Sequence, residues 1–108
     1  MSGVGDFIPL SSAAFQILVA LASGPKHGYA VMGEARLNPG TLYTTIKRLL
    51  DDELIRETPT PSDTADHDDR RRYYSITPLG RRVARAELER LQDVIDRAAG
   101  QLREKPAR

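Results

Sequence analysis

Residues 38–50 read Asn-Pro-Gly-Thr-Leu-Tyr-Thr-Thr-Ile-Lys-Arg-Leu-Leu, and this stretch decides the fold. Asn38 is a favoured N-cap residue, and a proline directly after it loses only an N–H that would have no partner within a helix. Four apolar residues then recur at helical spacing and fall on one face: Leu42, Ile46, Leu49 and Leu50. The stretch therefore predicts an amphipathic helix from Pro39 to about Glu53.

The opposite face of this helix is polar and has Lys47 at its edge; its members are Thr41, Thr44, Thr45 and Arg48. A threonine can hydrogen-bond a base edge or touch a thymine methyl, and an arginine can contact guanine or phosphate. The first amides of the helix, at Gly40 and Thr41, suit a phosphate because helix N-termini favour anions. We interpret this face as a DNA-reading surface, although the same residues would also suit a merely solvated helix face.

Two helices and an arm are predicted upstream. Ser11 or Ser12 can cap a helix over residues 12–23, whose apolar side chains lie almost all round it and place it at the centre of the fold. A short helix from His27 to Ala35 follows, with His27 capping or packing at its start and with the apolar members Tyr29, Val31 and Met32. Residues 1–10 are expected to form an arm without regular structure, interrupted by Gly3, Gly5 and Pro9.

A hairpin and a long helix are predicted downstream. Leu54 to Thr58 and Arg71 to Ile76 read as two strands around a loop that is rich in proline and aspartate. Thr77-Pro78 then repeats the cap-then-proline pattern and opens a helix that could continue to about Glu104. Three helices followed by a hairpin are the plan of a winged helix-turn-helix domain, whose third helix enters the DNA major groove.

The predicted fold class is therefore mainly α with a small β-hairpin: a winged helix-turn-helix plus a long C-terminal dimerisation helix. Residues 1–77 form the DNA-binding domain with its N-terminal arm, and residues 78–108 form the dimerisation helix.

The last predicted helix carries an apolar seam with spacings of 4, 3, 4, 3 and 4, made by Ala84, Leu88, Leu91, Ile95, Ala98 and Leu102. A helix of about 26 residues is ~39 Å long, whereas a domain of this size has a radius of gyration near ~13 Å. We favour a second copy of the chain as the partner of the seam, with residues 10–15 completing the interface, over a helix that folds back on its own core. A symmetric dimer would read half-sites ~34 Å apart on a pseudo-palindrome.

Charge is balanced in sum but segregated along the chain. Sixteen Lys and Arg residues against fifteen Asp and Glu residues leave a net charge of +1. Five acids lie between Glu57 and Asp69 with no Lys or Arg, and four form an acidic hairpin tip: Asp63, Asp66, Asp68 and Asp69. Six arginines follow before the next acid: Arg70, Arg71, Arg72, Arg81, Arg82 and Arg85. The first three are predicted to contact the DNA backbone at the base of the hairpin, while the acidic tip stays away from phosphate.

Composition excludes several functional classes. The absence of cysteine excludes disulfides, zinc fingers and thiol chemistry. His27 and His67 alone make a poor ligand set, so no metal and no cofactor are expected. No Ser or Thr has a nearby His and carboxylate, and no glycine-rich loop follows a strand, so an enzyme is not expected. The longest apolar run, Ala13 to Ala22, falls short of the ~20 residues that span a bilayer, and we expect a cytoplasmic protein without membrane contact.

Several motifs in this order resemble the PadR family of bacterial transcriptional regulators. They are His27-Gly28-Tyr29, Asn38-Pro39-Gly40-Thr41-Leu42-Tyr43, Lys47-Arg48-Leu49, Leu54-Ile55, the run from Arg70 to Thr77, and Leu79-Gly80. The resemblance implies a homodimeric repressor that binds double-stranded DNA through a winged helix and releases it when a small, often aromatic or drug-like molecule binds. Family members usually have several more residues before the second motif, so either the second helix is short or a stretch is missing near residues 33–36.

The predicted DNA contacts combine the third helix and the hairpin base: Asn38, Gly40, Thr41, Tyr43, Thr44, Thr45, Lys47, Arg48, Arg70, Arg71 and Arg72. The ring of Tyr43 is expected to pack, with its hydroxyl near bound DNA. One alternative is a protein-interaction adaptor that does not bind DNA and uses the acidic hairpin tip. Another is a dimer that acts chiefly as a small-molecule receptor, for which Phe7, Phe15 and Tyr29 are candidate ligand contacts.

Overall fold

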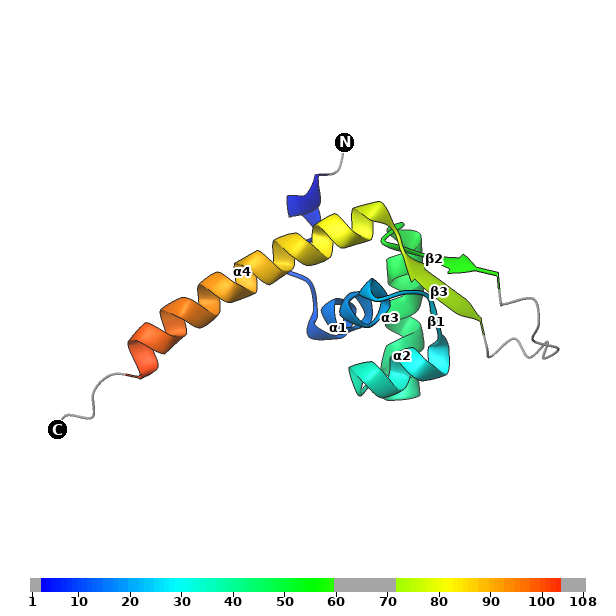
Figure 1. Cartoon of the computed structure of the whole chain (residues 1–108), viewed down its shortest axis with the longest axis horizontal. Helices are drawn as coiled ribbons and strands as arrows, with labels where there is room; N and C mark the ends of the chain where they lie inside the picture. The colour runs from blue at the N-terminus through cyan, green and yellow to red at the C-terminus, as the bar shows by residue number, and fades with distance from the viewer. Residues whose placement is uncertain (1–2, 60–71, 104–108) are drawn as a thin grey trace.

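The computed structural model describes residues 3–59 and 72–103 (Figure 1). Its elements, in chain order, are a 3-10 turn η1 (Val4–Phe7), α1 (Ser12–Ala22), β1 (Lys26–His27), α2 (Gly28–Ala35), α3 (Pro39–Asp51), β2 (Ile55–Thr58), β3 (Tyr73–Ile76) and α4 (Pro78–Leu102). Three helices, a hairpin and a long helix therefore follow one another as the sequence predicts.

Each α-helix begins at a side chain that caps it. Ser11 accepts from the Ala14 amide, and Asn38 accepts from the Thr41 amide at 2.8 Å. The Thr77 hydroxyl accepts from the Gly80 amide at 2.9 Å, and His27 Nδ1 accepts from the Ala30 amide at 3.2 Å. Such bonds satisfy backbone donors that a helix leaves unpaired at its N-terminus. The predicted caps are thus confirmed.

The sheet has one strand more than the predicted hairpin. Its order is β1-β3-β2, and both pairs are antiparallel. In β1, Lys26 pairs with Tyr74 and His27 pairs with Tyr73. Two residues are too few to show an alternating pattern, so this strand could not be recognised in the sequence. It ties the start of α2 to the hairpin.

The core is centred on α1, as its apolar surroundings predict. Ile17, Leu18 and Leu21 are fully buried in it. The other fully buried apolar side chains come from α2, α3, the sheet and α4: Val31, Leu42, Leu49, Leu54, Ile55 and Val83. One expected apolar member of α2, Tyr29, is instead exposed.

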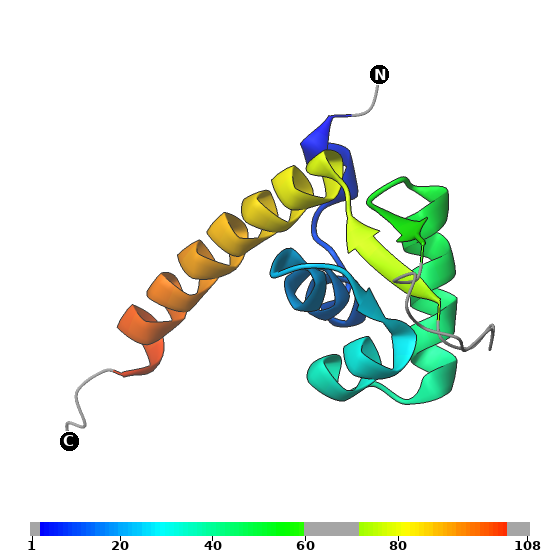
Figure 2. The ribbon, with the colours of Figure 1, turned by 45° about the vertical axis from the view of Figure 1, so that its right-hand side comes forward.

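The helix α4 serves the core only with its first half. It runs past the other helices and extends beyond them (Figures 1 and 2). The molecule measures 64 × 35 × 23 Å and has a radius of gyration of 16.8 Å, against ~13 Å for a compact domain of this size. Within residues 3–59 and 72–103, no helix is both long and apolar enough to cross a membrane.

The expectation of an arm without regular structure is wrong. Residues 4–7 form the turn η1, and the apolar side chains of the arm pack against the core: Val4, Phe7, Ile8 and Leu10. The arm contacts α4, and the backbone of Leu10 helps to lower the pKa of the Glu87 carboxyl on that helix. Apolar burial therefore outweighs the local tendency of glycine and proline to prevent structure.

Glu87 is a buried charge on α4 and is 2% exposed. Arg90 donates to both of its oxygens, each at 2.8 Å. These bonds lower the pKa of the Glu87 carboxyl, against the opposing effect of burial. The ionised pair therefore stabilises the folded state at neutral pH, and this contribution is lost as the pH falls through the lowered pKa.

Gly80 fixes how closely α4 approaches the turn before β2. A Cβ built on Gly80 would lie 2.0 Å from the Leu54 carbonyl oxygen and 2.9 Å from Ile76 Cγ1. A backbone oxygen cannot move aside as a flexible side chain would. Only glycine therefore lets α4 pack here.

We predict that Gly80→Ala lowers the free energy of unfolding by about 1–3 kcal/mol, the usual cost of overpacking a tight site. The matched control is Gly100→Ala in the same helix, where an added Cβ meets nothing within 4 Å. This control should be neutral or stabilising by up to ~1 kcal/mol. Urea denaturation at one protein concentration measures both, and equal effects of the two substitutions would contradict the assignment.

Candidate nucleic-acid interface

The outer face of α3 presents most of the residues predicted to contact DNA. Its buried face is made by Leu42, Ile46 and Leu49, which pack in the core with α1. On the opposite side the exposed residues are Asn38, Gly40, Thr41, Thr44, Lys47 and Arg48, while Thr45 is half-buried. The structure therefore brings the predicted hydroxyl-bearing face together at the surface, with Thr45 turned towards the interior.

Both α2 and the turn that joins it to α3 are short. The turn consists of residues 36–38 alone, and α2 ends at Ala35 after eight residues. Arg36 adopts the left-handed conformation with φ 57°, and the Leu37 amide donates to the Met32 carbonyl at 3.2 Å. In this chain the second helix is therefore short.

Tyr43 is a predicted DNA contact on α3 that also packs against α2. It lies on the second turn of α3 and is 40% exposed. A Cβ built on Gly28 would lie 3.2 Å from its hydroxyl oxygen and 3.6 Å from the nearest ring carbon. The ring therefore packs over Gly28, in keeping with the expected packing, and glycine there allows the two helices to approach.

The hairpin base presents Arg72 to solvent. Arg72 Nη1 donates to Glu57 Oε2 at 2.9 Å across the two strands, and both side chains are exposed. Beside them, burial and the neighbouring Glu57 raise the pKa of Tyr74. The other two members of the predicted arginine cluster, Arg70 and Arg71, lie outside the described residues, as do the four aspartates of the acidic tip.

The two basic residues of α3, Lys47 and Arg48, have different neighbours. Lys47 Nζ lies 4.0 Å from Asp51 on the solvated side of the helix. Arg48 instead lines a cavity of about 210 Å³ between α3 and the arm, together with Asp6 and Asp52. Arg48 thus stands at the margin of the predicted DNA face, on the side of the N-terminal arm. Helical spacing alone could not show this, because the arm comes from elsewhere in the sequence.

The apolar seam of α4 is exposed where the helix leaves the core. Leu88 is 53% exposed, Ile95 57% and Leu102 82%, whereas Ala84, Leu91 and Ala98 are half-buried. Solvated leucines and isoleucines in a row along one helix are typical of a surface that contacts a partner.

A cavity of about 460 Å³ continues the seam between α1 and α4. Its lining is mainly apolar and includes two arginines. The lining residues are Phe15, Val19, Ala22, Ile76, Arg81, Ala84, Arg85 and Leu88. Of the three aromatic residues considered as ligand contacts, Phe15 lines this cavity, whereas Phe7 and Tyr29 do not.

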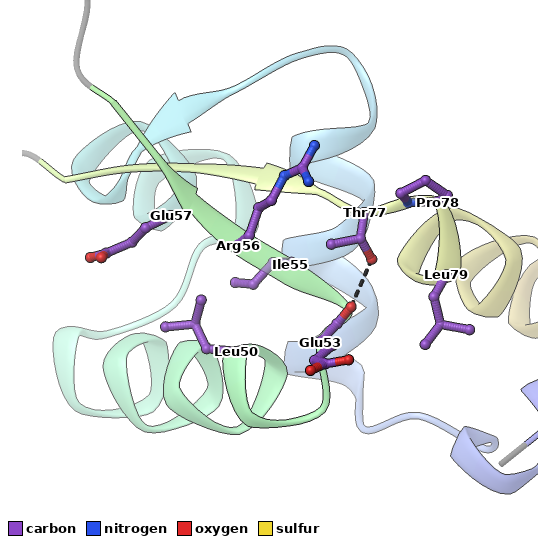
Figure 3. A pocket seen from close by; sticks show the side chains of 8 residues that line it. All are labelled: Leu50, Glu53, Ile55, Arg56, Glu57, Thr77, Pro78 and Leu79. Carbon is purple, nitrogen blue, oxygen red and sulfur yellow. Dashed lines mark hydrogen bonds between the residues drawn. The ribbon is translucent and has the colours of Figure 1, made fainter. Parts of the chain in front are cut away.

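A second groove lies between α3, β2 and the start of α4 (Figure 3). The groove has a volume of about 570 Å³. Its apolar lining residues include Leu50, Ile55 and Leu79, and its charged lining residues are Glu53, Arg56 and Glu57. Thr77 closes one end, because its hydroxyl donates to the Glu53 carbonyl at 2.8 Å. None of the residues predicted to contact DNA lines this groove.

Sequence reasoning missed two features of these surfaces. Glu87 follows Gly80 and Val83 at helical spacing, so it lies on the buried stripe of α4 and could have been recognised as a core charge. The position of His27 between two tyrosine rings depends on the unpredicted strand β1.

The described part of the chain brings together no group of three or more His, Asp or Glu side chains that could hold a metal ion.

The arrangement defines the class of the protein. Two short helices joined by a tight turn, preceded by α1 and followed by a hairpin, make a winged helix-turn-helix, and α4 is appended to it. Transcriptional regulators of the winged-helix type share this architecture.

Residues 17–86 match the family described as transcriptional regulator PadR-like family, and the chain belongs to that family. The predicted resemblance is therefore confirmed. The family and the similar structures are transcriptional regulators rather than enzymes.

A relative and several solved structures are similar to this chain. An uncharacterized 37.1 kDa protein in transposon Tn4556 of Streptomyces fradiae is 34% identical over 83 residues, which cover 71% of this chain and 22% of the relative. This chain therefore spans about a fifth of the length of that relative. A PadR family transcription regulator from Clostridium difficile has a similar structure, with a TM-score of 0.72 at 21% identity over 87% of this chain and 100% of that one.

BpsR of Bordetella bronchiseptica, whose DNA binding is regulated by 6-hydroxynicotinic acid, is also similar. Its TM-score is 0.71 at 22% identity, over 95% of this chain and 72% of that one. At this level of identity the likeness concerns the fold.

Proposed function

We propose that this regulator is a homodimeric repressor that binds a pseudo-palindromic DNA site. The observation that carries the proposal is the outer face of α3, which is held outward by a buried opposite face and presents small hydroxyl groups behind an asparagine cap. Membership of the PadR-like family supports a role in transcription.

Base reading falls to the exposed threonines of α3 in this proposal. Thr41 and Thr44 are small enough for the helix backbone to approach the base edges, and their methyl groups suit thymine. Asn38, Gly40 and Tyr43 lie near the start of the helix, where the amides favour a phosphate. Lys47 and Arg48 flank the threonines and supply positive charge.

Phosphate contact falls to the hairpin base. Arg72 is described there, and Arg70 and Arg71 directly precede it in the sequence. A DNA phosphate would compete with Glu57 for the guanidinium of Arg72, which costs little because an exposed ion pair contributes little. Such contacts position the protein without reading sequence.

The dimer is proposed to form along α4. The exposed seam residues Leu88, Ile95 and Leu102 lose their contact with water when a second copy packs against them. A two-fold interface uses the same patch on both copies, which a self-complementary apolar stripe allows. Two recognition helices related by that axis would contact successive turns of the major groove.

An effector is proposed to enter the cavity between α1 and α4. Phe15, Val19 and Leu88 give it apolar walls and Arg81 and Arg85 supply positive charge, which suits an aromatic acid. BpsR offers a parallel, since 6-hydroxynicotinic acid regulates its DNA binding. A ligand here would bias the angle between α4 and the core, and therefore the spacing of the two recognition helices.

We predict that two variants separate base reading from phosphate contact. Thr44→Ala should reduce the preference for DNA from upstream of the protein's own gene over a scrambled duplex, by about 1–3 kcal/mol for a base contact. Arg72→Gln should weaken binding to both duplexes alike and flatten the salt slope by about one unit. Fluorescence anisotropy across a salt series measures both effects. Absence of any salt-sensitive DNA binding by the wild type would contradict the proposal, and salt-insensitive protein binding would favour the adaptor.

We predict that Ile95→Glu converts the dimer to a monomer, because it places charges within an apolar interface. The control is Arg97→Glu, which puts the same residue on an exposed site away from the seam and should leave the dimer intact. Light scattering at micromolar concentration measures the mass. A wild-type monomer, or dissociation by both substitutions alike, would contradict the proposed interface.

A further inference from the structure

All four tyrosines of the chain lie around the start of α2. The His27 ring meets the Tyr29 ring edge-on at 6.2 Å between centroids, and meets Tyr73 edge-on at 5.6 Å. Tyr43 packs over Gly28, and Tyr74 is buried next to Tyr73 on β3. The chain has no other tyrosine, so its phenolic hydroxyls are confined to this one region.

This region connects the two surfaces already proposed to contact DNA. Tyr43 belongs to α3, Tyr29 lies on the first turn of α2, and Tyr73 directly follows Arg72 at the start of β3. The Gly28 amide donates to the Arg72 carbonyl at 3.2 Å, which holds the start of α2 against the hairpin base. We call His27, Tyr29, Tyr43 and Tyr73 the aromatic patch.

The patch presents hydrogen-bond donors to solvent. Tyr29 is 42% exposed and Tyr43 40% exposed, and His27 and Tyr73 are half-buried. Because His27 Nδ1 accepts from the Ala30 amide, Nε2 is the ring nitrogen that is left to donate to a ligand. No acidic residue lies in the first turn of α2, so this turn does not repel an anion.

We propose that the aromatic patch is a third DNA contact, which hydrogen-bonds backbone phosphates between the recognition helix and the hairpin base through uncharged donors. The proposal rests on the proposed DNA-binding function and adds His27, Tyr29 and Tyr73 to the predicted contacts, which already included Tyr43. Tyrosine hydroxyls are common partners of DNA phosphates. A chain with a net charge of only +1 gains affinity in this way without adding cations.

The absence of charge gives the patch a distinctive signature. A cation that neutralises a phosphate releases condensed counterions, so its loss flattens the dependence of affinity on salt. A phenol releases none when it donates a hydrogen bond. Removing its hydroxyl therefore lowers affinity for every sequence while the salt slope stays the same, unlike the removal of Arg72.

The test is Tyr29→Phe, alone and combined with Tyr73→Phe, which keeps the rings and their packing but removes the hydroxyls. Tyr74→Phe is the matched control, because Tyr74 follows Tyr73 on the same strand but is only 5% exposed. The duplexes are the protein's own upstream DNA and a scrambled sequence, titrated over a salt series. Thermal melting of each variant confirms that folding is preserved.

We expect Tyr29→Phe to weaken binding to both duplexes about tenfold, as for the loss of a hydrogen bond to a charged group, with an unchanged salt slope. The double variant should be weaker still, and Tyr74→Phe should match the wild type. If the wild type binds DNA and the double variant binds equally well, the patch proposal is wrong while the proposed function stands. If the wild type binds no DNA, both are wrong.

Discussion

The packing of α3 on the core is the constraint on which the rest of the structure depends. A helix that buries Leu42, Ile46 and Leu49 can turn only one other face to solvent, and in this chain that face carries Thr41 and Thr44. The side chains that fix the helix thus also fix what it presents. The recognition surface needs no support of its own, because core packing at native density sets its orientation.

The helix α4 carries two rows of side chains, one buried against the core and one exposed to solvent. Gly80, Val83 and Glu87 face the core and the arm, and the glycine sets how near the helix can come. The neighbouring stripe, with Leu88 and Ile95, is exposed and continues beyond the domain. Because one rigid helix carries both, a change at a dimer interface would be felt at the core. The cavity between α1 and α4 lies where the two stripes meet.

The fold could be predicted as far as it is local. Asn38, Thr77 and Ser11 cap their helices through neighbours three residues away, so their pattern is visible in the sequence. The strand β1 could not be predicted, because its two residues become a strand only by pairing with β3. The order of the arm likewise depends on its contacts with α4 and the core, which are distant in sequence.

The candidate site divides in the same way. Helical periodicity predicted the outward face of α3, yet it could not place Arg48 beside the arm, since that position depends on Asp6 and Asp52 around a shared cavity. The aromatic patch could not be predicted from the sequence either, because Tyr29, Tyr43 and Tyr73 come from three elements that meet only in the folded chain. Charge counting was uninformative here, because the donors of the patch are neutral.

The central claim is that the exposed face of α3 reads DNA as one half of a symmetric dimer. A footprint of the purified protein on the DNA flanking its own gene tests this claim most directly. The account predicts two protected half-sites, related by a pseudo-two-fold axis and about one helical turn, ~34 Å, apart. A single unpaired protected site, or no protection at concentrations where the protein is dimeric, would contradict it.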